Sequence, residues 1–319
     1  GIKFYFIDNE QYFNRYQTYG EPDDGERFAF FSKAAVDMMP HIDFKADVMN
    51  ANDWHAALSV VYLDRYRRER NDFYKDMKSV ISIHNVEFQG KFNPYLLGSL
   101  FGLGNDYLGA LKFDHDINLL KGAIQLADRV NTVSENYANE LLNPYFSFGL
   151  DPILSSERGK LRGIVNGIDY DKFDPSSDPN ISQKFSLKSL NKKIKNKLAF
   201  QKEMALEVSE DIPMVGMVTR LTGQKGIDLV VGAAEHILNM GAQLVILGTG
   251  DPYFEDQLRN LENRRHDKMR SILKFSNEIS SKIYASSDIF LMPSKSEPCG
   301  LSQLIAMRYG SIPVVNRVG

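Results

Sequence analysis

The sequence predicts an α/β protein built on parallel sheets, and three observations lead to this fold class. Short apolar runs alternate along the chain with amphipathic runs, as expected for parallel strands joined by crossover helices. Basic or polar turns follow several of the apolar runs, at the position where open α/β sheets bind their ligands. The length of 319 residues is sufficient for two domains.

The predicted strands share a short apolar run that ends at a turn. In chain order they are Ile2–Ile7, Ala46–Met49, Val80–Ile83, Arg129–Val133, Leu161–Val165, Met214–Val218, Leu244–Leu247, Ser271–Phe275, Ile289–Met292 and Ile312–Val315. The predicted helices share apolar residues at helical spacing and include Trp54–Tyr66, Ile117–Leu126, Leu229–Asn239 and Glu278–Ser286.

The border between the two domains is predicted near Leu161–Asp169. We therefore expect an N-terminal domain over residues 1–163 and a C-terminal domain over residues 164–319. The chain opens in one predicted strand and stops just after another. For this reason we expect a fragment that lacks both ends of a longer protein.

The composition is that of an ordinary globular protein, with 43% hydrophobic and 25% charged residues. The net charge of −3 gives no electrostatic support for a nucleic-acid partner, and no apolar run has the length of a membrane span. Cys299 is the only cysteine, which excludes an internal disulfide and a cysteine-pair zinc site and fits a reducing cytoplasm. No metal site is predicted. The lysine-rich run Lys188–Lys197 is interpreted as a solvated loop and helix start.

The most informative stretch is Asp288–Gln303. Its apolar strand is followed by a helix that is predicted to begin around Pro298, because proline suits the first turn of a helix. Glu297 then lies at the strand-to-helix turn. The free amides of the helix start, which favour phosphate, belong to Gly300, Leu301 and Ser302. A carboxylate beside a phosphate cradle is suited to accept hydrogen bonds from hydroxyls, so the ligand is predicted to be a phosphorylated sugar.

A second anion-binding element is predicted in the turn Thr219–Gly226, which follows a strand. Arg220 offers a planar fork and Lys225 a point charge, the donors that a pyrophosphate needs. Gly223 and Gly226 let the backbone approach a ligand closely. The alternative is a surface turn with two solvated cations. Two such turns after strands of one sheet favour the ligand site.

In the first half, His84 and Asn85 directly follow a predicted buried strand, and such side chains commonly bind hydroxyl groups. The alternative is a turn whose polar groups are satisfied within the protein. Asn166 follows another strand in an Asn-Gly turn, where Asn tolerates the backbone conformation. It also begins the second domain, so it could face a cleft.

The segment Asn52–His55 opens a predicted helix. Asn52 or Asp53 would serve as the N-cap, with Trp54 buried, and this structural interpretation is favoured. The functional alternative has Asp53 or His55 facing a cleft between the domains.

These residues resemble the bacterial glycogen synthases and plant starch synthases, a family of retaining glucosyltransferases. The combination of the Glu-Pro-Cys-Gly-Leu block with the Arg-Leu-Thr-x-Gln-Lys-Gly turn is highly specific. The matching segments run in order over nearly the whole chain and are Asp8–Glu10, Tyr12–Phe13, Tyr19–Phe28, Asn52–Ala56, Ile83–Asn85, Gln89–Gly90, Thr132–Ser134, Asn166–Asp169, Arg220–Thr222, Gln224–Gly226, Pro293–Ser294 and Glu297–Leu301.

The resemblance implies the GT-B fold, in which two Rossmann-like domains face each other across a cleft. It implies transfer of glucose from ADP-glucose to the non-reducing end of an α-1,4-glucan such as glycogen, in the cytoplasm and without a cofactor. The implied catalytic residues are Glu297, His84, Arg220 and Lys225. The implied substrate-binding residues are Asp53, Asn85, Asn166, Cys299, Gly300, Leu301, Phe275 (near the nucleotide base) and Tyr12.

Departures from the family pattern leave alternatives open. The Lys-x-Gly-Gly loop of the family and its glycine-rich turn after Gly319 lie outside this sequence. One alternative is therefore a truncated, non-catalytic glucan-binding or regulatory form. Another is a sugar phosphorylase that holds pyridoxal phosphate on a lysine, for which the sequence shows no strong motif. The sequence does not decide between ADP-glucose and UDP-glucose, and it does not give the glucan chain length, oligomeric state or regulation.

Overall fold

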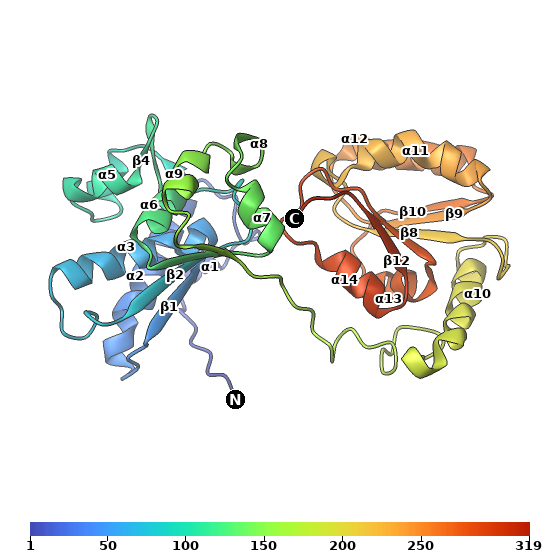
Figure 1. Ribbon diagram of the computed structural model, residues 1–319, viewed down its shortest axis with the longest axis horizontal. Coiled ribbons are helices and arrows are strands. Elements are labelled where there is room, and N and C mark those ends of the chain that lie inside the picture. The colour runs from blue at the N-terminus through green and yellow to red at the C-terminus, as the bar shows by residue number, and fades with distance from the viewer. The chain divides into compact units, whose positions relative to one another are not determined.

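A computed structural model describes residues 1–319 as two compact units, Gly1–Val165 and Asn166–Gly319 (Figure 1). Each unit has its own parallel sheet with helices packed against it, which confirms the predicted α/β class. None of the helices combines the length and the apolar character that a membrane crossing requires.

The first unit contains a four-stranded parallel sheet in the order β1-β2-β6-β7. Its strands are β1 (Val48–Asn52), β2 (Lys78–Ile83), β6 (Arg129–Thr132) and β7 (Leu161–Gly163). The two-residue strands β3 (Lys91–Phe92) and β4 (Lys112–Phe113) flank β5 (Asp116–Asn118) in a small antiparallel sheet. The helical segments are α1 (Glu10–Phe13), α2 (Asp24–His41), α3 (Asp53–Arg68), α4 (Leu96–Ser99), η1 (Asn105–Tyr107), α5 (Leu108–Leu111), α6 (Leu119–Leu126), α7 (Glu135–Glu140), α8 (Pro144–Ser147) and α9 (Asp151–Ser156).

The register of the first sheet brings two polar strand ends together. In the pairing of β1 with β2, Asn52 lies opposite Ser82. The chain leaves β1 into helix α3, which packs on both strands, and leaves β2 into the loop that begins at His84. The residues that follow β1 and β2 are therefore neighbours at one edge of the sheet.

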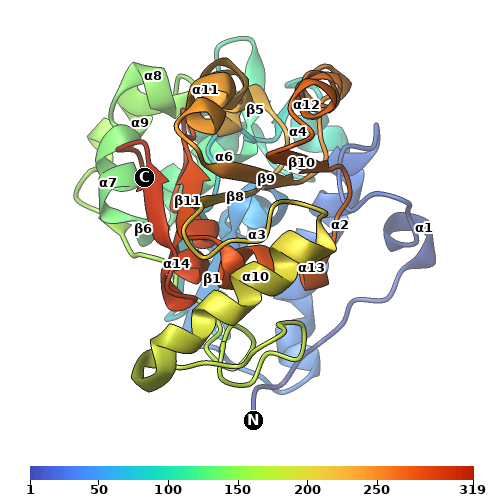
Figure 2. The ribbon, with the colours of Figure 1, turned by 90° about the vertical axis from the view of Figure 1, so that its right-hand side faces the viewer.

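The second unit contains a five-stranded parallel sheet in the order β10-β9-β8-β11-β12. Its strands are β8 (Met214–Val218), β9 (Gln243–Leu247), β10 (Met269–Ile272), β11 (Ile289–Met292) and β12 (Ile312–Val315). Its helical segments are η2 (Leu187–Lys193), α10 (Ile194–Glu203), η3 (Gly223–Lys225), α11 (Ile227–Asn239), α12 (Pro252–Arg264), α13 (Asn277–Ser286) and α14 (Leu301–Arg308). Helices α11 and α12 cover one face of the sheet and α13 and α14 the other, with α10 beside α13 (Figure 2).

The central strands β8 and β9 are buried on both faces of the second sheet, which explains their nearly continuous apolar sequences. Along β8, Val215 and Met217 join the core beneath α11 and α12, whereas Met214 joins the core beneath α13 and α14. Along β9, Ile246 joins the core beneath α11 and α12, and Val245 joins the core beneath α13 and α14. The alternation of side chains in a strand thus supplies two cores from one apolar run.

The strand order of the second sheet creates a switch point between β8 and β11. From β8, the chain places β9 and β10 on one side and β11 and β12 on the other. Connections that leave β8 and β11 therefore diverge to opposite faces of the sheet. The crevice at the carboxyl ends of two such strands is the usual ligand site in open α/β sheets.

Several predicted elements differ from the structure. Ile2–Ile7 is not a strand, because no neighbouring strand pairs with it, and Ile2 and Phe6 are 84% and 89% exposed. The predicted strand Ser271–Phe275 is Met269–Ile272, so Phe275 lies in the following loop. The predicted helix start at Pro298 is wrong: α14 begins at Leu301, because Gly300 has a φ of +74° and lies outside the helical region.

Candidate active site

Two loops meet at the switch point of the second sheet. One carries Arg220 and Lys225 after β8, and the other carries Glu297 after β11. The ammonium Nζ of Lys225 lies 2.5 Å from Oε2 of Glu297, and the two side chains are only 14% and 11% exposed. The hydroxyl of Ser294 donates to the same carboxylate oxygen at 3.1 Å. The structure therefore joins two of the predicted site residues in a largely buried ion pair.

Further contacts hold the two loops together. The backbone N–H of Lys295 donates to the carbonyl of Gln224 at 2.8 Å, and the Lys295 ammonium pairs with Asp228 at 2.5 Å. Gly226 has a φ of +71°, and a Cβ at this position would lie 2.3 Å from the carbonyl oxygen of Pro293. The close approach at Gly226 is thus to Pro293 in the other loop, whereas the sequence-based interpretation had assigned it to a ligand.

A pocket of about 310 Å³ opens at the carboxyl ends of β8, β9 and β10. Arg220 and Lys274 line it, and no carboxylate does, so its side chains favour an anion. The Arg220 side chain is exposed and makes no hydrogen bond within the protein. Phe275, which is 84% exposed, presents its ring at the same pocket. A pocket of this size is at the lower end of the range for small-molecule sites.

The start of helix α14 also lines this pocket. Gly300 is the N-cap, and the first amides of the helix, those of Leu301 and Ser302, have no partner within the helix. The Ser302 hydroxyl lies 3.5 Å from the carbonyl of Val218 at the end of β8, which places the helix start against the strand. The free amides predicted at a helix start are thus present for Leu301 and Ser302, although the helix begins later than predicted, and their binding of phosphate stays a prediction.

Cys299 lies before the N-cap of α14, so its predicted place in the first helical turn is wrong. Its carbonyl accepts a hydrogen bond from Nε2 of Gln303 at 2.6 Å, and its side chain is half-buried. We expect Cys299→Ser to keep substantial activity and to escape inhibition by thiol reagents, because a thiol adduct would inhibit by its bulk rather than by removing a nucleophile. The measurement is glucosyl transfer before and after treatment with a thiol reagent. An inactive, folded Cys299→Ser variant that still binds ADP would contradict this.

In the first unit, the last residue of β1 and the first residue of α3 hold the loop after β2. The carboxylate Oδ1 of Asp53 accepts hydrogen bonds from the backbone N–H groups of His84 at 2.8 Å and of Asn85 at 3.4 Å. Oδ1 of Asn52 lies 2.9 Å from Nε2 of the His84 ring. The structure therefore brings together three residues that the sequence predicted for the site, Asp53, His84 and Asn85.

The predicted capping role of this segment is wrong in one respect. Asn52 is the N-cap of α3 by its backbone, but neither Asn52 nor Asp53 makes a side-chain capping bond, because both side chains bond to the His84 loop. Asp53 also has a φ of +54°, a left-handed conformation that costs free energy in a residue other than glycine. Trp54 is buried, as predicted.

His55 packs among aromatic rings. Its ring centroid lies 4.6 Å from that of Phe28 and 4.3 Å from that of Trp54. Burial lowers the pKa of His55 below its usual range, and its Nε2 is buried without a hydrogen-bond partner. These contacts favour a packing role for this histidine.

Tyr12 and Asn166 are not tied to these clusters. Tyr12 lies in α1, and its hydroxyl donates to the carboxylate of Glu26, which raises the pKa of Tyr12. Asn166 is the first residue of the second unit, and its side chain makes no hydrogen bond within the protein. Ligand binding by either residue stays a prediction.

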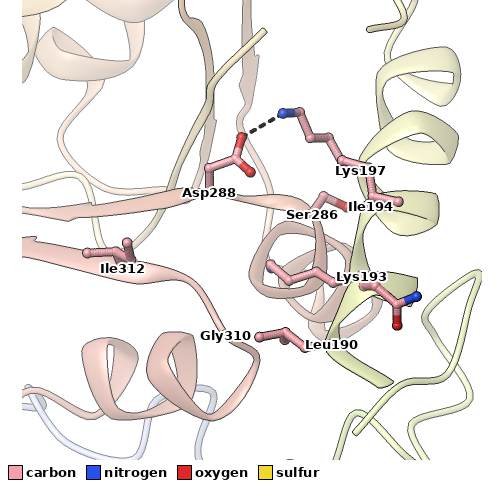
Figure 3. Close-up of a pocket in the computed structure, with 9 residues that line it drawn as sticks. Leu190, Lys193, Ile194, Lys197, Ser286, Asp288, Gly310 and Ile312 are labelled. Carbon is pink, nitrogen blue, oxygen red and sulfur yellow. Dashed lines mark ion pairs between the residues drawn. The ribbon is translucent and has the colours of Figure 1, made fainter. Parts of the chain in front are cut away.

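A second cavity, of about 320 Å³, lies at the amino-terminal edge of the second sheet (Figure 3). Asp288, just before β11, and Ile312, at the start of β12, belong to its lining, together with Lys193 and Lys197. This edge is opposite to the carboxyl ends of the strands, where the anion pocket lies. The two cavities are therefore separate.

The lysines of this second cavity are engaged within the protein. Lys197 pairs with Asp288 at 2.8 Å and is 4% exposed. Burial lowers the pKa of Lys193 to about 7, and its ammonium donates to two carbonyls at the end of α13 and to the hydroxyl of Ser311. The prediction that Lys188–Lys197 is solvated is thus wrong for the side chain of Lys197 and for the ammonium of Lys193, whose contacts tie α10 and the end of η2 to the rest of the second unit.

The sequence did not indicate three residues that lie in or beside these clusters. Lys274 brings a second cation to the anion pocket, and Asp228 pairs with Lys295 beside the Lys225–Glu297 pair. Asn52 was considered only as a cap. Each lies within a few residues of a predicted site residue, but the position of its side chain depends on how the loops fold.

Comparison with known proteins gives matches along both units. Residues 1–156 match a family model described as the starch synthase catalytic domain, and residues 200–319 match the model for glycosyl transferases group 1. A glycogen synthase of Streptococcus mutans is 48% identical over 100% of this chain and 67% of its own length. A glycogen synthase of Clostridium botulinum is 47% identical with the same coverage.

A solved structure is also similar to this chain. The catalytic domain of starch synthase IV from Arabidopsis thaliana, bound to ADP and acarbose, matches with a TM-score of 0.88 and 37% identity. The match covers 97% of this chain and 64% of that chain. This chain thus spans about two thirds of the length of the relatives that it matches.

Proposed function

We propose that this chain, which belongs to the glycogen synthase and starch synthase family of glycosyltransferases, transfers glucose from ADP-glucose to the non-reducing end of an α-1,4-glucan with retention. The expected GT-B fold class is confirmed by the two α/β units and the match to starch synthase IV. The observation that carries the proposal is the Lys225–Glu297 ion pair. It joins the loop that brings Arg220 to the cationic pocket with the loop that leads into helix α14, whose start lines the same pocket. A cytoplasmic location stays a prediction.

The donor is assigned to the second unit. Arg220 and Lys225 bind the diphosphate, with the amides of Leu301 and Ser302 as further donors. Lys225 has three N–H donors and uses one of them on Glu297, so it can hold a phosphate oxygen without releasing the carboxylate. Phe275, on the rim of the pocket, is assigned to the nucleotide base. Starch synthase IV binds ADP in its solved structure, which supports this nucleotide as the donor carrier.

Glu297 is assigned to the glucosyl group of the donor. A carboxylate can accept hydrogen bonds from sugar hydroxyls and stabilise positive charge that develops at the anomeric carbon. In the proposed step, the bond from this carbon to the phosphate oxygen breaks and a bond to the acceptor hydroxyl forms on the same face. The acceptor proton passes to the leaving phosphate. Preorganised charge from Arg220 and Lys225 stabilises the diphosphate as it leaves.

The glucan acceptor is assigned mainly to the first unit. His84 and Asn85 are proposed to bind sugar hydroxyls, in a loop whose backbone Asp53 holds in place. Tyr12 and Asn166 are proposed as further contacts, as the resemblance implies. Acarbose in the starch synthase IV structure supports an oligosaccharide as ligand of this fold.

The test is transfer of radiolabelled glucose to glycogen from ADP-glucose and, separately, from UDP-glucose. The assay is run on this chain and on a version extended to the full length of its relatives. We expect transfer from ADP-glucose in the extended protein. Transfer from UDP-glucose alone would overturn the assigned donor, and glucan binding without transfer in both proteins would support the non-catalytic alternative.

The phosphorylase alternative is tested separately. A phosphorylase of that kind would release glucose 1-phosphate from glycogen and inorganic phosphate and would show the absorbance of bound pyridoxal phosphate. We expect neither signal from the purified protein. Either signal would replace the synthase proposal by the phosphorylase alternative.

A further inference from the structure

We propose that Asn52 is a positioning residue that fixes the ring of His84 in one orientation and one tautomer, so that Nδ1 is presented to a sugar hydroxyl as a hydrogen-bond acceptor. The proposal deepens the proposed function, on which it rests through the assignment of His84 to sugar binding. Its structural part, the state of the His84 ring, can be tested without any activity.

Two consecutive residues hold His84 at two different points. Asp53 accepts the backbone N–H of His84 at 2.8 Å, and Asn52 contacts ring atom Nε2 at 2.9 Å. The backbone contact places the residue, whereas the ring contact selects the rotamer. Because His84 is exposed, its ring would otherwise be free to rotate, and ordering it on substrate binding would cost conformational entropy.

The chemistry of the contact decides the tautomer. A side-chain amide oxygen only accepts hydrogen bonds, so Oδ1 of Asn52 requires a hydrogen on Nε2 of His84. In the neutral imidazole, the other nitrogen then has no hydrogen and accepts. Nδ1 is thus prepared to accept a hydrogen bond from a hydroxyl, the group that distinguishes a sugar.

The side chain of Asn52 does not stabilise helix α3, although Asn52 is the N-cap residue of that helix. Asn is a favoured N-cap residue because its side chain bonds to the helix amides, but Asn52 makes no such bond. Its oxygen is directed to the neighbouring strand end instead. The register of β1 and β2, in which Asn52 pairs with Ser82, is what brings Asn52 within reach of a residue so distant in sequence.

The chain offers a matched control two residues earlier. Asn50 lies on the same strand and is also exposed, but its Oδ1 contacts the Ser82 hydroxyl at 2.9 Å rather than His84. Asn52→Ala removes the ring contact, Asn52→Asp keeps an acceptor oxygen at the same place, and Asn50→Ala removes an equivalent amide that does not touch His84.

The experiment combines nitrogen NMR of the His84 ring with transfer kinetics. The ring is observed in protein labelled with ¹⁵N-histidine at about pH 8, where an ordinary imidazole is neutral. We expect the Nε2–H tautomer in the parent protein, in Asn52→Asp and in Asn50→Ala, and a mixture of both tautomers in Asn52→Ala. In glucosyl transfer, Asn52→Ala is expected to be about tenfold slower, the scale of one hydrogen bond, and the other two variants close to the parent.

The outcomes separate this proposal from the proposed function. An Nδ1–H tautomer in the parent, or an unchanged ring in Asn52→Ala, overturns the proposal whatever the activity shows. Unchanged transfer in Asn52→Ala while His84→Ala is strongly impaired overturns it as well, because His84 then acts without the help of Asn52. Full transfer in His84→Ala instead removes His84 from sugar binding, and the positioning role of Asn52 falls with that assignment.

Discussion

Glu297→Gln is expected to lose orders of magnitude in glucosyl transfer while it binds free ADP about as well as the parent protein. The substitution keeps the size of the side chain and an oxygen that can accept from Lys225 and Ser294, so the loop should keep its structure. It removes the negative charge that we assign to the sugar and to the developing positive charge. ADP lacks the glucosyl group that Glu297 is assigned to bind, so its binding should not depend on that charge.

The measurement is calorimetry with ADP beside the transfer assay. Asp228→Asn is the matched control, since it removes the carboxylate of the exposed Lys295–Asp228 pair that lies beside the buried pair. Solvent screens this exposed pair, so its loss should leave the loop folded and this control should transfer glucose at nearly the parent rate. Normal transfer by Glu297→Gln would reduce Glu297 to a structural turn residue.

Arg220→Ala and Lys225→Ala are each expected to lower turnover by about 10²–10³-fold, the effect of losing one charge-stabilising donor. The structure adds a difference between them. Arg220 is exposed and makes no hydrogen bond within the protein, so its removal should change the free energy of unfolding by no more than about 0.5 kcal/mol. Removing Lys225 leaves the carboxylate of Glu297 unpaired and mostly buried, and breaking a buried pair in this way costs about 3–5 kcal/mol.

Turnover and thermal unfolding should therefore be measured on both variants. The double variant Lys225→Ala with Glu297→Gln serves as the control, because it removes the unpaired charge and should recover part of the stability without recovering turnover. Near-parent turnover of either single variant in the extended protein would remove that residue from the donor site. Equal thermal stability of Lys225→Ala and the parent would show that the ion pair contributes little to the fold.

Parts of the fold follow from local sequence alone. The strands Met214–Val218, Ile289–Met292 and Ile312–Val315 have the predicted bounds, since each is an apolar run that ends where a turn begins. Helix α12, which is not among the helices named from the sequence, also has a local start signal, because Asp251 caps its first turn and Pro252 follows. Ile2–Ile7 was wrong because apolar residues make a strand only where another strand accepts their hydrogen bonds.

The sequence by itself determined the α/β class, the family resemblance and the residue types of the candidate site, because strand periodicity and motif spacing are local properties of the chain. Only the tertiary structure decided which of these residues touch. The pairing of Lys225 with Glu297 depends on β8 lying next to β11, and the contact of Asn52 with His84 depends on the register of β1 and β2. The burial of Lys197 likewise depends on where α10 packs. Contacts between residues far apart in sequence arise from packing, and a local pattern does not contain them.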